Sequence, residues 1–574
     1  MSRNRLCVHI GWSIVCFIIS TLSLKTLQAQ SPTTPAVSPK PTSLRRTADG
    51  LYTIENSQVR VGINTNYGGA ITYMAFANDQ NGQVSTQNMI NNNDLGRQSQ
   101  IALYGGPLDY SKNGSGHWIN LGWDPIQAGS TQGDVSQVLS VEKQDNLLYA
   151  KTVPKQFALK NEPGEAYIEH WIRLEGNLVK VHAKVTLFRA DKTQYEGRQQ
   201  EFPCLYTNGD YHNIWGYTKE APYTNAPLEL RRIKPSENMF YEDAFPTEPW
   251  MATTNDNGYG VGLFVPNNLD FKRGYFGQEL GGDEFSGTAA YVGATPHIVL
   301  DHDIVYEWDY VYIVGNLDQI RSYVYSQPRP SPKPNFRFDT SRKGWYYQRA
   351  QDTGWRVDGK LHVLLDNAAT ARITSPYVFW KGRENPKVYI RAAFKTQTDT
   401  FKFNWRRNDD QYMYASSDRF VELPVINDGQ YHTYAVDLSA NPNWLDYNIG
   451  QIELSPITTN DSPGAWVEIA WIASSPDGPT PEAVTETPDF TQPPVVTNPP
   501  ATAPPAVTTP PVVTEPSVTT PVITNPPATE PPAAPVATNP GDAPVVVSPP
   551  VANAPVANAL CVPRCVLLQI KKIR

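Results

Sequence analysis

The sequence predicts an all-β protein that consists of a large antiparallel β-supersandwich and a smaller β-sandwich of the jelly-roll type. Three observations favour this fold class. Apolar residues alternate with polar ones over many short segments, turn residues separate these segments, and the periodicity of long helices is absent. A chain of 574 residues with 51 prolines is also large enough for several domains.

The first thirty residues have the order of a secretory signal. Arg3 and Arg5 precede an apolar run from Val8 to Leu24, and small residues follow around Ala29. We therefore expect a signal peptide over residues 1–29, with an uncleaved membrane anchor as the alternative, and a Pro/Ser/Thr-rich linker over residues 30–46. The predicted location is secreted, periplasmic or at the cell surface.

Strand patterns fill the region that follows. Val179–Leu187 alternates apolar and polar residues, Ala166–Phe188 reads as a hairpin that turns at residues 175–177, and Ile304–Val314 reads as one long strand. A proline-rich linker over residues 328–334 separates two folded parts, which we place at residues 47–327 and 335–475.

The C-terminal region has a different composition. Residues 476–560 contain 24 prolines and no Lys or Arg, which predicts a disordered Pro/Thr-rich spacer in extended conformations. The tail at residues 561–574 is too short to span a membrane, and a surface anchor, the remnant of a missing domain and a reading-frame artefact remain open. Attachment to a cell surface through the spacer is one interpretation.

The second folded part carries a pattern with a known counterpart. Gly344-Trp345, Asp428–Leu438 and Val467–Ile472 resemble, in this order, the jelly-roll carbohydrate-binding modules of secreted glycan-degrading enzymes. The resemblance implies glycan binding by aromatic rings and polar groups, and the candidates are Trp345, Tyr347, Trp405 and Arg406; the alternative is that these Trp residues are core. Ala470 stands where the family often has Asp, so no cofactor is required, and a structural Ca²⁺ is left open.

The first folded part resembles the galactose-mutarotase-like supersandwich of aldose epimerases, several glycoside hydrolases and polysaccharide lyases. The resemblance rests on the segment from Val59 to Gly69, on the strand Ala70–Met74 after the Gly-Gly turn, and on residues 90–100. It implies a candidate catalytic domain for sugars over residues 47–327. The histidine motifs and the C-terminal glutamate motif of mutarotases are not legible, which argues against simple epimerase chemistry.

Polar residues in turn-rich segments are the substrate-binding candidates. Asp94, Arg97 and Gln100 form a polar cluster in which Arg97 suits sugar hydroxyls or a carboxylate, and an internal Asp94–Arg97 salt bridge is the alternative. Trp123 and Gln127 lie in a loop that resembles the rim of a sugar subsite. The remaining candidates are Asn208 and Trp250.

Four side chains are candidates for acid/base catalysis. Glu248 lies beside Trp250, and an apolar neighbour raises the pKa of a carboxyl toward that of a general acid. His170 shares a strand face with Ile168 and Ile172, where a core histidine is the alternative. Glu201 and Asp309 are the other carboxyl candidates, although each could simply lie at the surface.

The sequence thus indicates a secreted carbohydrate-active enzyme, with glycoside hydrolysis of a polysaccharide or oligosaccharide as the preferred reaction and carboxylates as its acid and base. A lyase or epimerase on the same sugars and a non-catalytic glycan-binding envelope protein are the alternatives. Charged residues make up only 18% of the chain without a basic block, so we expect no nucleic-acid partner.

Overall fold

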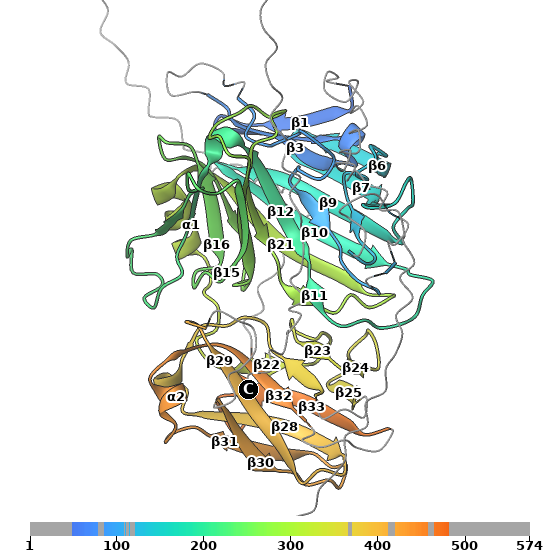
Figure 1. Ribbon diagram of the computed structural model, residues 1–574, viewed down its shortest axis with the longest axis vertical. Coiled ribbons are helices and arrows are strands. Elements are labelled where there is room, and N and C mark those ends of the chain that lie inside the picture. Colours follow the sequence, from blue (N-terminus) through green and yellow to red (C-terminus); the bar gives the residue numbers. More distant parts are fainter. Residues whose placement is uncertain are drawn as a thin grey trace, which may run out of the picture.

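The computed structural model describes residues 49–481 apart from gaps at 79–84, 86, 108, 111–113, 115–120, 366–369, 411–418 and 457–463. The predicted signal peptide, the N-terminal linker, nearly all of the C-terminal spacer and the tail lie outside the described residues. Within them, the all-β prediction is confirmed: two antiparallel β-sandwiches follow one another along the long axis (Figure 1).

The first sandwich is built on a nine-stranded sheet and a seven-stranded sheet. The nine-stranded sheet has the order β14-β13-β16-β17-β21-β10-β9-β7-β6, with bounds β6 (Gln137–Gln144), β7 (Leu147–Val153), β9 (Ala166–Glu175), β10 (Leu178–Leu187), β13 (Asn213–Gly216), β14 (Glu229–Arg231), β16 (Trp250–Thr254), β17 (Tyr259–Phe264) and β21 (Val305–Asn316). The seven-stranded sheet has the order β15-β18-β19-β12-β4-β5-β8, with bounds β4 (Gln100–Ala102), β5 (Pro125–Ile126), β8 (Lys155–Gln156), β12 (Glu201–Asn208), β15 (Met239–Ala244), β18 (Phe271–Phe276) and β19 (Ala289–Ala294).

Smaller elements complete this sandwich. A three-stranded sheet contains β1 (Leu51–Glu55), β2 (Val59–Asn64) and β3 (Ala70–Phe76), and a two-stranded sheet pairs β11 (Arg198–Gln199) with β20 (His297–Ile298). Helix α1 (Leu317–Ser326) follows β21 and begins with a capping box, in which the side chains of Asn316 and Gln319 each accept from the other's backbone N–H. Its Ile320 and Val324 pack on the nine-stranded sheet.

Alternation along the strands explains why the two large sheets face each other. In β10, Val179, Val181 and Val185 are buried, whereas the polar residues between them are partly exposed, as the sequence pattern predicts. The predicted hairpin is also present, because β9 and β10 pair and Gly176 turns between them with φ +56°. Apolar side chains from both sheets form one large core.

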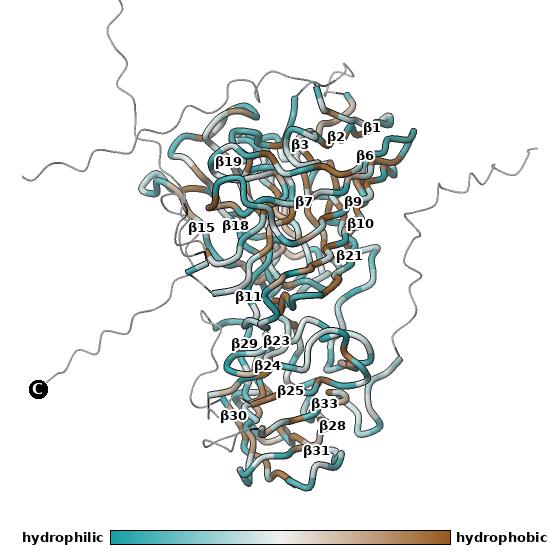
Figure 2. Tube along the Cα trace, turned by 90° about the vertical axis from the view of Figure 1, so that its right-hand side faces the viewer, coloured by the Kyte–Doolittle hydropathy of each residue, from teal (hydrophilic) through white to brown (hydrophobic). Residues whose placement is uncertain are grey.

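The second sandwich has two six-stranded sheets. One contains β24 (Ala350–Asp352), β25 (Leu361–Leu365), β33 (Trp466–Ala473), β28 (Lys387–Lys395) and β31 (His432–Asp437), with β22 (Asn335–Arg337) paired to β33. The other contains β23 (Tyr346–Gln348), β26 (Arg372–Thr374), β32 (Asn448–Ser455), β29 (Thr400–Arg407) and β30 (Phe420–Pro424), with β27 (Trp380–Lys381) paired to β32. A short helix, α2 (Pro442–Leu445), precedes β32. The sheets enclose a separate core, and Figure 2 shows the two bodies joined at a narrow region.

A buried ion network joins the two sandwiches. Arg342 of the second sandwich binds Asp352 through Nε and Nη2, both at 2.6 Å, and its Nη2 also donates to Asp301 of the first sandwich at 3.0 Å. Gln194 of the first sandwich donates to both carboxylates. Arg342 and Asp301 are almost completely buried. Paired buried charges of this kind fix the relative position of the parts that carry them.

Among the described residues, no helix has the length and apolar character that a membrane crossing requires.

Candidate functional site

The outer face of the seven-stranded sheet, which points away from the core, carries a cluster of aromatic rings. Alternate residues of its strands, such as Phe202 and Val292, point into the core. The opposite set forms a separate apolar cluster. We define the aromatic face as four rings of this cluster, Tyr206, Tyr241, Phe276 and Tyr291, together with Tyr104, which packs on a neighbouring cluster and reaches Glu201 through its hydroxyl. The ring centroids of Tyr206 and Tyr291 are 4.7 Å apart and those of Tyr241 and Tyr291 are 5.3 Å apart.

Rings of this face are partly accessible. Tyr104, Tyr206 and Tyr241 are half-buried, whereas Tyr291 is fully buried beneath them. Flat, half-exposed rings with hydroxyl groups can pack against the apolar faces of sugar rings and also bind their hydroxyls. The aromatic face therefore has the chemistry of a carbohydrate-binding surface.

Glu201 lies at the start of β12 within the aromatic face. Its Oε1 accepts a hydrogen bond of 2.7 Å from the Tyr291 hydroxyl, and its Oε2 lies 3.5 Å from the Tyr104 hydroxyl. Burial raises the pKa of Glu201, and the hydrogen bond from Tyr291 and the charge of Lys272 only partly oppose this rise. The carboxyl is 7% exposed. A carboxyl with a raised pKa beside accessible rings is suited to give or take a proton.

Asp124 is the second buried carboxyl on this side of the sheet. It is fully buried just before β5, and no side chain donates a hydrogen bond to its carboxyl oxygens. Burial raises its pKa to about 8, although backbone groups of Phe157 and Ala158 and the charge of Arg198 oppose this. Arg198 also lies over the ring of Tyr104, at 6.0 Å. At neutral pH Asp124 is therefore a neutral acid.

Two cations border the aromatic face. Lys272 forms an ion pair with Asp243, and its Nζ lies 5.5 Å from the centre of the Tyr241 ring. Arg97 lies 5.6 Å from the centre of the Phe276 ring, and its Nε is 3.2 Å from Asp94 Oδ2. These groups place hydrogen-bond donors and a carboxylate, that of Asp243, around the rings.

The predicted cluster around Arg97 is thus divided. Asp94 and Arg97 form the salt bridge that the sequence left open as an alternative, and Arg97 still reaches the aromatic face. Gln100 is buried, and its Oε1 accepts from the Ala128 N–H at 2.8 Å while its Nε2 donates to the Leu95 carbonyl at 3.3 Å. Gln100 is therefore engaged in holding two backbone segments together.

His170, Trp123 and Gln127 lie inside the first sandwich. Trp123 belongs to the large core, and Gln127 Nε2 lies 3.4 Å from His170 Nδ1. Burial lowers the pKa of His170 to about 3, so the imidazole is neutral at neutral pH. The structure thus corresponds to the alternative of a core histidine, and the two other side chains do not form a rim. Asn208 is also buried and donates to the Asn88 carbonyl at 2.6 Å.

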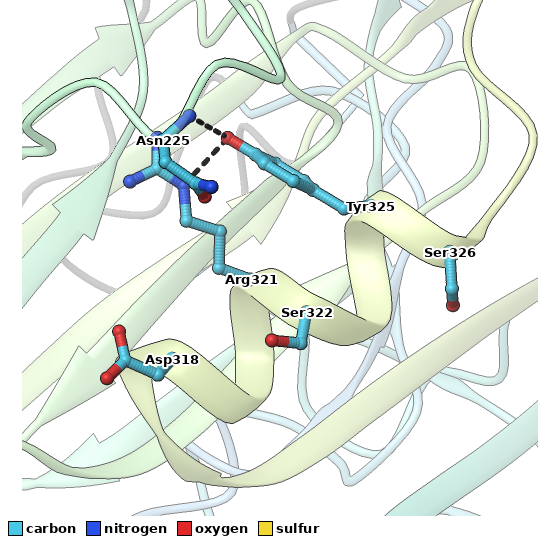
Figure 3. Close-up of a pocket in the computed structure, with 6 residues that line it drawn as sticks. All are labelled: Asn225, Asp318, Arg321, Ser322, Tyr325 and Ser326. Atoms are coloured by element: carbon cyan, nitrogen blue, oxygen red, sulfur yellow. Dashed lines mark hydrogen bonds between the residues drawn. The ribbon is translucent and has the colours of Figure 1, made fainter.

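Glu248 is bound by Tyr325, one of the residues that line a surface hollow of about 580 Å³ beside α1. Figure 3 shows the lining residues of this hollow. The Glu248 oxygens accept from the Tyr325 hydroxyl at 2.8 Å, the Tyr223 N–H at 2.7 Å and the Trp250 indole at 2.9 Å. In the hollow, Arg321 donates to the Tyr325 hydroxyl at 2.8 Å. Glu248 and Trp250 are fully buried. Because its donors are all provided by the protein, this carboxylate anchors α1 to the sheet.

Asp309 lies on a different sheet from Glu201. It lies on the outer face of the nine-stranded sheet, where its Oδ1 is 2.9 Å from His182 Nδ1. The structure therefore does not bring Asp309, His170, Glu201 and Glu248 together, and of these four only Glu201 belongs to the aromatic face.

The glycan-binding candidates of the second sandwich are all buried. Trp345 and Trp405 belong to its core, which is the alternative that the sequence kept open, and the Trp405 indole donates to the Asn443 carbonyl at 3.1 Å. The Tyr347 hydroxyl donates to Asp352 at 3.0 Å in the network between the sandwiches. Arg406 lies over the ring of Phe245 of the first sandwich, at 4.6 Å. None of these four side chains presents a free ring or cation to solvent.

The metal left open by the resemblance does not fit the residues present. Ala470 offers only its carbonyl, which accepts from the Phe338 N–H at 3.3 Å. In the part of the chain that the structure describes, no group of three or more His, Cys, Asp or Glu side chains is arranged to hold a metal ion.

Sequence reasoning identified Glu201 but missed the residues around it. Tyr104, Tyr241 and Tyr291 come from three other strands or their ends, and 90 residues separate Tyr291 from Glu201. Asp124 had a signal, because it stands beside Trp123 between apolar strands, but its burial could not be read from its neighbours. Cross-strand register brings these side chains together, and a single sequence does not reveal register.

No protein-family model matches the chain, and no curated protein matches it either. Among solved structures, it is similar to a galactose mutarotase-like protein from Lactobacillus casei, with 12% identity over 46% of this chain and 100% of that chain and a TM-score of 0.29. A galactose mutarotase related enzyme from Lactobacillus acidophilus matches with 12% identity, 46% and 97% coverage and a TM-score of 0.29. A 4-alpha-glucanotransferase from Thermococcus litoralis matches with 13% identity, 47% and 38% coverage and a TM-score of 0.27. At these values the matches carry no information on activity, which has to come from the side chains.

Proposed function

We propose that this protein is a secreted carbohydrate-active enzyme that binds its sugar on the aromatic face and uses Glu201 as the acid/base carboxyl, with glycoside hydrolysis as the reaction. The observation that carries the proposal is the position of Glu201, a carboxyl with a raised pKa among half-exposed tyrosines. In this reaction the protonated Glu201 gives its proton to the glycosidic oxygen, and the Tyr291 hydroxyl stabilises the carboxylate that remains.

A second carboxylate has to activate water or attack the sugar. Asp243 is the candidate for this role, because it is half-exposed on the same sheet face and Lys272 holds it as an ion pair. Arg97 and Lys272 border the same rings and are placed to bind hydroxyls.

Lyase chemistry is the second candidate, and Tyr104 favours it. A half-buried phenol whose oxygen lies 3.5 Å from a carboxyl can exchange a proton with it and abstract one from a sugar carbon. In that reaction Tyr104, and not Glu201, contacts the substrate.

The test uses the full secreted chain on a panel of polysaccharides and their short oligosaccharides. New reducing ends without ultraviolet absorbance support the hydrolase, and absorbance of unsaturated sugars supports the lyase. We expect Glu201→Gln to lower kcat/KM at least about 100-fold, while the exposed Glu55→Gln leaves it unchanged. No turnover on any sugar, or full turnover by Glu201→Gln, would refute the proposal and favour a glycan-binding envelope protein.

A further inference from the structure

The outer face of the nine-stranded sheet has two unlike halves. Over one half, α1 packs against Val311, Ile313 and Phe264. Over the other half, formed by β6, β7, β9 and the part of β10 that follows Leu178, α1 does not pack. Side chains on this second half are therefore available to a partner.

Strand register aligns four of these side chains, together with Asp309 of the neighbouring β21, in one row. Glu142 pairs with Tyr149, Tyr149 with Trp171, Trp171 with His182, and His182 with Asp309. We call them the cross-strand row. With about 4.8 Å between neighbouring strands, the row extends about 19 Å across the sheet.

The three rings of the row are in contact and none of them is fully buried. The ring centroids of Tyr149 and Trp171 are 4.9 Å apart, and those of Trp171 and His182 are 5.3 Å apart. All three are half-buried, so each presents part of its ring to solvent. A continuous strip of aromatic surface thus crosses an open sheet.

Charges beside the strip are balanced. Lys151 Nζ lies 3.7 Å from Glu169, Lys184 Nζ lies 2.7 Å from Glu307, and the Tyr149 hydroxyl donates to Glu169 at 2.7 Å. Because each of these cations has an anion beside it, and Glu142 and Asp309 add further carboxylates, this surface has no excess positive charge to attract phosphate groups or acidic polymers. Its mixture of rings and paired charges fits a ligand with apolar faces, many hydroxyls and no net charge.

We propose that the cross-strand row is a second binding site, which holds a segment of a neutral polysaccharide across β6, β7, β9, β10 and β21. The apolar faces of the sugars contact Tyr149 and Trp171, and their hydroxyls bind Glu142 and Asp309 at the ends of the row. This site is on the opposite sheet from the aromatic face, so it goes beyond the reaction assigned to Glu201. By binding the polymer, this site keeps the aromatic face close to its substrate and raises the effective concentration of that substrate.

The experiment is affinity electrophoresis of the full chain in gels that contain hydroxyethylcellulose, galactomannan or starch, with alginate and pectin as acidic polymers. We expect retardation by at least one neutral polymer, and an increase of the dissociation constant of about tenfold or more in Trp171→Ala. The matched control is Phe188→Ala, which removes an exposed ring outside the row and should change the constant by less than about twofold. Tyr149→Ala provides the same test if Trp171→Ala does not fold, as judged by circular dichroism.

Three results would overturn the proposal: no retardation by any neutral polymer, equal retardation of the row variants and the wild type, or retardation by the acidic polymers alone. Glu201→Gln separates this site from the proposed reaction, because it should lose turnover on short oligosaccharides and keep the retardation. Retardation that depends on Trp171, together with unchanged turnover in Glu201→Gln, would refute the reaction and leave the second site standing.

Discussion

Replacing Asp124 with Asn should stabilise the protein, and the gain should grow with pH. The wild-type carboxyl is fully buried, and burial raises its pKa from 3.8 to about 8, although backbone groups and the charge of Arg198 oppose this rise. In the unfolded chain the group ionises near pH 4, whereas in the folded protein it stays protonated up to about pH 8. Below pH 4 both states are protonated and titration of the group costs nothing; above it, folding requires uptake of a proton, so the contribution of this group to stability falls as pH rises to about 8.

The magnitude follows from the shift. About four pKa units at ~1.4 kcal/mol per unit give an upper limit of about 5–6 kcal/mol above pH 8 and about 4 kcal/mol at pH 7. The neutral carboxyl of the folded wild type and an Asn amide at the same place are both buried neutral polar groups, so the cost of burying such a group largely cancels between them. We therefore expect a gain of up to about 5 kcal/mol at pH 8 and about 1–2 kcal/mol at pH 5.

Urea denaturation at about pH 5 and pH 8 measures both values for the wild type and for Asp124→Asn. The control is Asp303→Asn, because Asp303 is an exposed carboxyl whose pKa is lowered by its hydrogen bond with Lys192, and its replacement gives no gain that grows with pH. If the difference between Asp124→Asn and the wild type is the same at both pH values, Asp124 is not held protonated and the reasoning on this site fails.

Two further predictions concern the interior. Burial lowers the pKa of His170 to about 3, so this imidazole should contribute a loss of stability of about 2–3 kcal/mol between pH 7.5 and pH 4.5 as the unfolded chain takes up the proton. The stability of His170→Leu relative to the wild type, measured by urea denaturation, should therefore rise by this amount over the same range, and a difference that does not change with pH would contradict a buried neutral imidazole. Arg342→Met should leave Asp301 and Asp352 buried without their cation and lower the free energy of unfolding by about 3–5 kcal/mol. Calorimetry should detect a lower Tm and separate unfolding of the two sandwiches. An unchanged single transition would show that the network does not join them.

How far the sequence could predict this structure depends on the range of the contacts. The hairpin from Ala166 to Phe188 could be predicted because its evidence is local: apolar residues at every second position and a glycine turn. The same alternation places His170 on the face of Ile168, which is the core face. The alternation of apolar and polar residues therefore predicts that His170 is buried in the core, although its imidazole had suggested a catalytic role.

The candidate site was less predictable because its contacts are distant. Glu201 meets Tyr104 and Tyr291 across about 90 residues or more in each direction, and a shift of one residue in the register of β12 would turn its carboxyl to the core. The complete burial of Asp124 is likewise a property of the fold. The residue type was enough to select Glu201 as a candidate, but its neighbours could be identified only from the strand register.

The contacts between the two sandwiches occupy side chains of the second sandwich that could otherwise bind sugar. An independent binding module presents its rings to solvent, but here Tyr347 and Arg406 contact Asp352 and Phe245 at the junction. Side chains that hold two domains together through buried charges cannot also bind a polymer without breaking those contacts. Half-exposed rings remain on both outer faces of the first sandwich, at Tyr206 and at Trp171. The four predicted residues of the second sandwich therefore do not supply a glycan surface, and both proposed surfaces lie on the first sandwich.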